Sequence, residues 1–269
     1  MKIHPKGKLI FLSFKEIEPQ EKEGDFSFIP GNVQLLTCLS DKKDVRIELI
    51  TSDSLSYTRL HKFYKRALSD VGYTNFNGIH FNSNGCIDSE TRKKLDVAEV
   101  VLFVGDQSGL FNILKESKIL GLLHKKYIEQ ENFVVAGVNI GSVCLPSMMI
   151  VEETRNDPFR KGLELIPSLG FIDNCIIDTQ YMQETGYDKL AYTIVEHRDF
   201  MGLGLGNDTA LIIEKGSVAS CRGDGTVMVI NPCDIDHLEK NCDTENHSFY
   251  MKNLKGRIMI DGCIVHLDD

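Results

Sequence analysis

The chain has 269 residues, 42% of them hydrophobic, and a formal net charge of −9. This hydrophobic content excludes the disordered and fibrous classes. The acidic balance argues against nucleic-acid binding, which needs a basic face, and no apolar run reaches the roughly 18 residues of a membrane span.

The eight cysteines are scattered without a Cys-x-x-Cys pair, and several have apolar neighbours. The basic segment 1–8 leads into only a short apolar run, whereas a signal peptide needs a longer run and a cleavage site. We therefore expect free thiols in a reducing compartment and a cytoplasmic protein. Because a chain of this length can share one core, we expect a single domain over residues 1–269.

Short apolar runs alternate with amphipathic stretches through the first half of the chain. Strands are predicted at 8–14, 45–51, 78–81, 99–104 and 133–136, and helices at 57–71, 88–96 and 110–130. The run 99–104 is almost wholly apolar, which is typical of a strand covered on both faces. The alternation predicts an α/β protein with a parallel sheet between two layers of helices.

After about residue 200 the pattern changes to short β runs separated by glycine-containing turns. These runs lie at 209–213, 217–221, 226–230 and 257–266. We expect them to be antiparallel strands added to the parallel sheet, not a second domain. The charged segment 16–25 and the polar segment 239–248 are predicted to be loops.

The most informative segment is 133–144, where a buried strand leads into a sharp turn and then a helix. Its centre, residues 137–141, reads Gly-Val-Asn-Ile-Gly, with Asn139 in the middle. This is the layout of a nucleophile elbow, in which the central residue stands on a strained turn and glycines let strand and helix pass closely. A residue held there lies near the positive end of the helix dipole.

Five motifs in the right order resemble the cyanophycinase and aspartyl dipeptidase (peptidase E) family of serine peptidases. The elbow aligns without a gap with that family's Gly-Thr-Ser-Ala-Gly, and segment 105–107, Gly-Asp-Gln, follows a buried strand as the family's Gly-Gly-Asp/Asn-Gln does. Segments 169–171, 178–181 and 202–210 are similar to the family's later motifs. The resemblance covers roughly residues 6–232. It implies a three-layer sandwich, flavodoxin-like or class I glutaminase-like, with a mainly parallel central sheet and antiparallel C-terminal strands.

The resemblance places amides at all three catalytic positions. The family's serine, histidine and glutamate align to Asn139, Gln180 and Asn207. An amide nitrogen has no lone pair available for attack, and glutamine does not accept a proton near neutral pH. The resemblance therefore implies a serine peptidase homologue with no intact catalytic residue, a pseudoenzyme.

Polar replacements at these positions favour a pocket that still meets solvent or a ligand. The candidate ligand-binding residues are Gly105, Asp106, Gln107, Gly137, Ile140 and Lys189. Lys189 keeps the charge of one of the family's basic substrate-reading positions, whereas the family's early Gly-Gly-Gly stretch is Ser-Phe-Lys here, at 13–15. We expect a peptide or acidic peptide-like ligand, or a homodimer or a heterodimer with an active paralogue, and no cofactor, nucleic acid or membrane.

The alternative is an active hydrolase of the same family that acts on aspartyl peptides with a relocated catalytic set. That set would draw on Ser142, Cys144, Asp106 or Asp178. Ser142 and Cys144 lie just past the elbow, where helix side chains face other directions. We expect Ser142 to hydrogen-bond within the fold and Cys144 to pack in the core. A purely structural subunit is a third reading.

Two histidine-containing features are predicted to be structural. His197 lies at a helix end, where we expect it to interact with the last carbonyls. The run of Cys233, His237, Cys242 and His247 matches the spacing of no common zinc finger. No metal site is expected.

Overall fold

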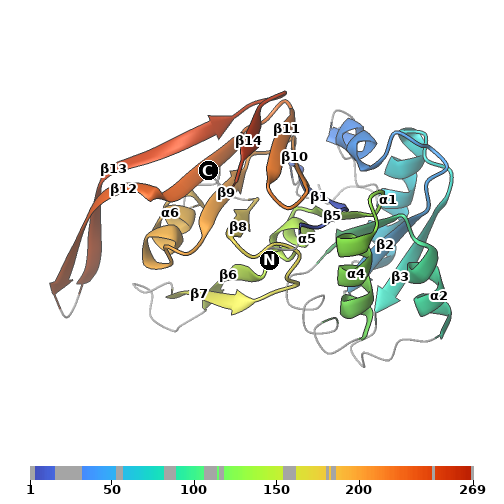
Figure 1. The fold of residues 1–269 in the computed structure, drawn as a ribbon, viewed down its shortest axis with the longest axis horizontal. Coiled ribbons are helices and arrows are strands. Elements are labelled where there is room, and N and C mark those ends of the chain that lie inside the picture. Colours follow the sequence, from blue (N-terminus) through green and yellow to red (C-terminus); the bar gives the residue numbers. More distant parts are fainter. Residues whose placement is uncertain are drawn as a thin grey trace, which may run out of the picture.

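The computed structural model describes residues 4–15, 32–52, 57–81, 89–105, 114, 118–153, 162–179, 182, 186–243 and 246–267. Over these residues the chain forms a central β-sheet with helices on both faces, beside a second, smaller sheet (Figure 1). The predicted α/β fold class is confirmed, including the mainly parallel core of the central sheet.

Eight strands form the central sheet, in the order β14-β11-β10-β1-β5-β4-β2-β3. Five of them are parallel: β1 (Lys8–Ser13), β5 (Val134–Val138), β4 (Val100–Val104), β2 (Ile47–Ser52) and β3 (Phe76–Phe81). Three antiparallel strands extend this sheet beyond β1: β10 (Thr209–Glu214), β11 (Val218–Gly223) and β14 (Ile264–His266).

Every residue of β4 and β5 is buried, as expected for parallel strands covered on both faces. One face packs on η1 (Asn32–Leu39) and α1 (Tyr57–Asp70), and the other on α2 (Ser89–Val97) and α4 (Lys118–Glu129). The helix 57–71 predicted from apolar spacing is therefore present. Gly72 follows it with a φ of 93°, as a helix-ending glycine does.

The C-terminal strands do not all join the central sheet, which corrects one expectation. A separate four-stranded sheet has the order β13-β12-β9-β8. Its strands are β8 (Cys175–Asp178), β9 (Met201–Leu205), β12 (Val227–Asp243) and β13 (Asn246–Met259). The predicted strand 226–230 lies in this second sheet, and the run 257–266 divides between β13 and β14.

The segment 239–248 was predicted to be a loop, and this prediction is wrong. β12 runs through Asp243 and β13 starts at Asn246, so the described residues of this segment, 239–243 and 246–248, lie in the paired strands of a long hairpin, which projects from the body of the molecule (Figure 1). The sequence misleads because this stretch lacks apolar alternation, while backbone hydrogen bonds between the two strands need none. The predicted loop 16–25 lies outside the described residues.

One further helix and a pair of strands lie beside the two sheets. α6 (Gly186–Glu196) packs through its buried side chains on the second sheet, and β6 (Met148–Glu153) pairs with β7 (Gly162–Pro167) as an antiparallel pair. No helix in the described part of the chain combines the length and apolar character needed to cross a membrane.

Candidate functional site

The strand–turn–helix expected around residue 139 is present. β5 ends at Val138, the short helix α5 (Ile140–Val143) begins at Ile140, and Asn139 lies between them with φ 48° and ψ −112°. A non-glycine residue in this conformation costs on the order of 1–3 kcal/mol and persists only where the surroundings fix it. Asn139 therefore stands on a strained turn, as the central residue of an elbow does.

The two glycines that flank Asn139 are required by close backbone approach. A Cβ on Gly137 would lie 2.5 Å from backbone atoms of Gly141 and Ser142, and a Cβ on Gly141 would overlap the carbonyl oxygen of Phe103 on β4. α5 therefore lies directly against the ends of β4 and β5. This close packing holds the elbow in its strained shape.

The side chain of Asn139 is bound to the segment that follows β1. The backbone N–H of Phe14 donates to Asn139 Oδ1 at 2.7 Å, and Asn139 Nδ2 donates to the Phe14 carbonyl at 3.1 Å. The backbone N–H of Asn139 donates to the Leu12 carbonyl at 2.8 Å. Both functional groups of the carboxamide are thus used within the fold, and they hold the end of β1 against the elbow.

Ser142 and Cys144, the nucleophiles of the alternative reading, both point into the protein. Ser142 is fully buried; its Oγ accepts from the Leu12 N–H at 3.0 Å and lies 2.7 Å from the carbonyl of Gly137. Cys144 is fully buried, with its Sγ 3.9 Å from Met149 Sδ. The expectation that one hydrogen-bonds within the fold and the other packs in the core is confirmed. Neither atom can meet a substrate in this structure.

Segment 178–181, which contains Gln180 at the position of the family's histidine, begins at the end of β8. Gln180 lies outside the described residues, but the carbonyl of its neighbour Thr179 accepts a hydrogen bond from Ser13 Oγ at 3.4 Å. Asp178 is buried, and Lys189 Nζ on α6 lies 3.7 Å from its Oδ2. The ammonium of Lys189 is therefore directed at a buried carboxylate, which sequence reasoning did not anticipate.

Segment 202–210, which contains Asn207 at the position of the family's glutamate, includes the turn between β9 and β10. Asn207 is exposed, and Asp208 has a φ of 59°. Gly225 N–H donates to the Asp208 carbonyl at 3.1 Å, and a Cβ on Gly225 would overlap the Asn207 carbonyl oxygen. The backbone of this turn is fixed by its neighbours, while the Asn207 side chain meets solvent.

The end of β1 brings these three motifs together. Ser13 pairs with Thr209, the first residue of β10, and its hydroxyl reaches Thr179, while Phe14 binds Asn139. In the sequence, segment 13–15 is recognisable only as an altered glycine stretch. Its role as the common contact of the three motifs became visible only in the structure.

The remaining candidate residues lie beside the elbow or outside the described chain. Gly105 follows β4 directly, with a φ of 106°, on the same sheet edge as Gly137 and Ile140. Asp106 and Gln107 lie outside the described residues.

Cys175, the first residue of β8, is a buried thiol. Burial raises the pKa of Cys175 to about 12, so this thiol stays protonated and unreactive at neutral pH.

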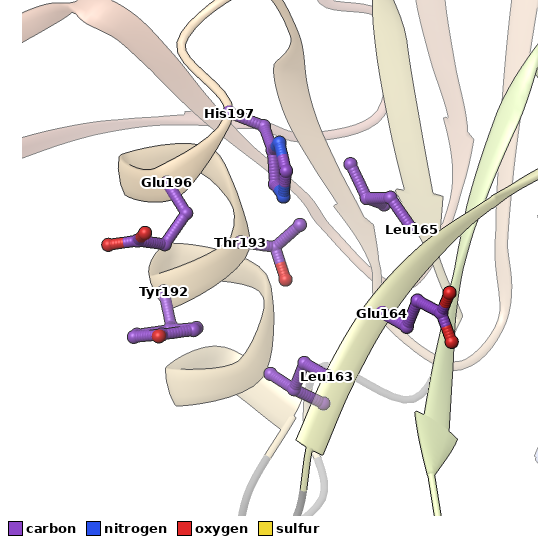
Figure 2. Close-up of a pocket in the computed structure, with 7 residues that line it drawn as sticks. All are labelled: Leu163, Glu164, Leu165, Tyr192, Thr193, Glu196 and His197. Atoms are coloured by element: carbon purple, nitrogen blue, oxygen red, sulfur yellow. The ribbon is translucent and has the colours of Figure 1, made fainter. Parts of the chain in front are cut away.

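A small pocket lies away from these motifs, between β7 and α6. It has a volume of about 130 Å³, and its lining includes Leu163, Leu165, Thr193 and His197 (Figure 2). The ring of His197 faces this pocket (Figure 2). We expected His197 to interact with the last carbonyls of the helix; its backbone N–H does so, donating to the Thr193 carbonyl at 2.9 Å. Among the predicted site residues that the structure describes, none lines the pocket.

The structure gives no support to a metal centre in the part of the chain that it describes, where no three His, Cys, Asp or Glu side chains lie close enough to hold an ion. Cys233 is exposed on β12. The side chains of His237, Cys242 and His247 lie outside the described residues.

The fold and the turn at residue 139 define the class of the protein: a three-layer α/β protein with the elbow of a serine hydrolase. The sequence profile of Peptidase family S51 matches residues 40–221, and the chain belongs to this family.

Curated relatives agree with the family. The chain is 23% identical to the cyanophycinases of Trichormus variabilis and Nostoc sp. over 184 residues, which is 68% of this chain but 61% of theirs. It is also 23% identical to the cyanophycinase of Synechococcus elongatus, over 85% of this chain and 73% of that protein. The chain thus spans only about three fifths of the length of the first two relatives.

Solved structures support the fold. A peptidase from an acI-B1 Actinobacterium superposes with a TM-score of 0.66 over 98% of both chains, at 14% identity. A putative peptidase E protein from Listeria monocytogenes superposes with a TM-score of 0.52 over 81% of this chain and 98% of the other, also at 14% identity.

Proposed function

We propose that this member of peptidase family S51 does not hydrolyse peptides. It acts instead as a subunit that binds a peptide or an acidic peptide-like ligand, as a homodimer or beside an active paralogue. The supporting observation is the pairing of the Asn139 carboxamide with both backbone groups of Phe14.

The residue at the elbow offers no atom that could attack a peptide bond. A serine hydrolase needs an exposed nucleophile and a base that takes its proton. At the elbow this chain presents an amide, which is neither, and the amide is committed to two hydrogen bonds. The turn keeps the strained backbone of an elbow although its central side chain has become part of the packing.

Several polar groups around the elbow are placed where they could contact a ligand. The exposed side chain of Asn207, the backbone of Gly105 and the end of β1 share one region with the elbow. These groups offer hydrogen bonds of the kind that orient a ligand in a binding site. The relatives' name, cyanophycinase, supports a peptide ligand of the cyanophycin type.

The alternative, an active hydrolase with a relocated catalytic set, is opposed by the burial of Ser142 and Cys144 and by the ion pair between Asp178 and Lys189. It remains the outcome that the experiment must be able to reveal.

The experiment measures hydrolysis of cyanophycin and of aspartyl dipeptides, together with labelling by a fluorophosphonate probe, which intact mass detects and peptide mapping locates. The proteins compared are the wild type, Asn139→Ala, Asn139→Ser and the triple variant Asn139→Ser/Gln180→His/Asn207→Glu. We expect no turnover and no label in the first two. The triple variant should gain slow turnover and a label at position 139, because serine, base and carboxylate are restored together.

Asn139→Ala is the matched control, since it removes the same hydrogen bonds as Asn139→Ser without adding a hydroxyl. Turnover by the wild type, or a label on Ser142, would contradict the proposal and favour the active hydrolase; because the probe reacts with serine, a Cys144 nucleophile would be revealed by turnover. Binding is measured separately by titration calorimetry of the wild type with an aspartyl dipeptide. A complete absence of heat with every aspartyl peptide tested would remove the peptide-binding part.

A further inference from the structure

Two cysteines face each other where β14 pairs with β11. The antiparallel register places Ala219 opposite Val265 and Ser220 opposite Ile264, so Cys221 and Cys263 come next. The Cys221 N–H donates to the Cys263 carbonyl at 3.0 Å. Gly262, with a φ of 79°, donates to the Cys221 carbonyl at 2.9 Å, so a bulge closes the ladder at this pair.

Both side chains lie on the same face of the sheet. Cys221 is fully buried in the core cluster that contains Leu211 and Ala219, and Cys263 is half-buried and packs against that cluster. Hydrogen-bonded residues opposite each other in an antiparallel pair have Cα atoms about 5.5 Å apart. Disulfides need Cα atoms about 4.4–6.8 Å apart, so a small adjustment of this pair suffices to form the bond.

A nearby cysteine does not compete for either thiol. Cys38, on η1, packs with the core of the opposite face of the central sheet. It is also half-buried, so it provides a thiol of similar exposure that the sheet separates from Cys221 and Cys263.

We propose that Cys221 and Cys263, both free thiols in this structure, form a reversible disulfide site that responds to low-molecular-weight disulfides such as oxidised glutathione. In the first step the thiolate of Cys263 attacks the oxidant, forms a mixed disulfide and releases one glutathione thiolate. In the second step the thiolate of Cys221 attacks the sulfur of Cys263 and releases the other. Two protein thiols are oxidised, the oxidant is reduced to two thiols, and the protein protons pass to these thiolates.

The surroundings set the order of the two steps. Burial, reinforced by Asp261 and Cys263, raises the pKa of the Cys221 thiol to about 11, while Arg222 and the Val227 backbone N–H oppose this rise. Cys221 is therefore protonated and shielded at neutral pH, and the half-buried Cys263 reacts first. The resulting mixed disulfide then lies beside Cys221, which closes the bond.

The bond would join the two ends of the segment that contains the β12–β13 hairpin, and it would fix the edge strand β14. The bond would also be linked to the Asn207 turn through two backbone contacts. Asp261 Oδ1 accepts a hydrogen bond from the Gly223 N–H at 3.1 Å, and the Gly225 N–H donates to the Asp208 carbonyl.

The test incubates the full chain in buffers with graded ratios of oxidised to reduced glutathione. Intact mass, peptide mapping and thermal unfolding are then measured. We expect the loss of two hydrogen atoms, a peptide linking positions 221 and 263, and reversal by dithiothreitol. Because the bond closes a long loop, oxidation should raise the melting temperature by roughly 5–10 °C.

Cys263→Ser should abolish the link and the temperature shift, while the matched variant Cys38→Ser should retain both. Because Cys263 is half-buried, its serine variant tests the site without opening the core, and circular dichroism verifies its fold. A stable glutathione adduct on Cys263 without an internal bond would overturn the proposal. A bond to another cysteine, or no reaction at any ratio, would overturn it as well.

Discussion

Asn139 and Asn207 stand on two turns that meet near the end of β1, and the two turns are fixed in different ways. At residue 139 both the backbone and the side chain are held: glycines admit the close packing, and the carboxamide binds Phe14. At residue 207 only the backbone is held, by Gly225 and Thr209, and the side chain is exposed.

This difference shows which part of a catalytic scaffold the chain uses for stability. The elbow has become a structural joint whose central residue contributes hydrogen bonds to the fold. The Asn207 turn keeps its shape without using its side chain, which is exposed to solvent.

The most severe way to break the elbow is Gly141→Ala. The added Cβ would overlap the Phe103 carbonyl oxygen, so backbone must shift, and we expect a loss of about 3 kcal/mol or more in the free energy of unfolding. Urea unfolding monitored by circular dichroism measures it. Gly121→Ala on α4 is the control, because its Cβ meets nothing within 4 Å, and it should stabilise by up to about 1 kcal/mol. Equal effects of the two substitutions would refute close packing at the elbow.

The second largest loss of stability is expected from removal of the Ser142 hydroxyl, which joins the elbow to β1. Ser142→Ala leaves the buried Leu12 N–H without this acceptor, so we expect a loss of about 1–3 kcal/mol. Ser147→Ala, which removes an exposed hydrogen bond to the Asp173 carbonyl, should change stability by less than about 0.5 kcal/mol. The same urea titrations compare them. A neutral Ser142→Ala would mean that this hydroxyl does not support the joint.

Alanine substitutions of Asn139 and Asn207 are expected to have the smallest effects on stability. Asn139→Ala removes both bonds to Phe14, and alanine tolerates a positive φ less well than asparagine, so we expect a loss of about 1–2 kcal/mol. Asn207→Ala should stay within about 0.5 kcal/mol because its side chain is exposed. Thermal unfolding of both variants is the measurement. The comparison fails if Asn207→Ala proves the more destabilising of the two.

The parallel half of the fold could be predicted from the sequence because its strands are continuous apolar runs and its helices show apolar spacing. The elbow could be predicted because two glycines flank Asn139 after a buried strand. These signals are local, and the structure agrees with them at β4, β5 and α1.

The second sheet and the contacts of the site could not be predicted in the same way. The β12–β13 hairpin carries a polar sequence that is typical of loops, and its pairing depends on register between strands. The pairing of Asn139 with Phe14 and of Lys189 with Asp178 depends on how distant segments pack. No spacing within the sequence indicates such pairs.

The joint at the end of β1 has a consequence for how the chain folds. Phe14 and Asn139 are separated by 125 residues, and Ser13 and Thr179 by 166. Contacts between such distant residues form late, because the loop that they close must first lose its entropy. β1 is synthesised first, yet its partners β5 and β10 emerge from the ribosome much later. Until β5 and β10 are synthesised, the apolar residues of β1 lack their native partners, a condition that favours aggregation of an incomplete chain.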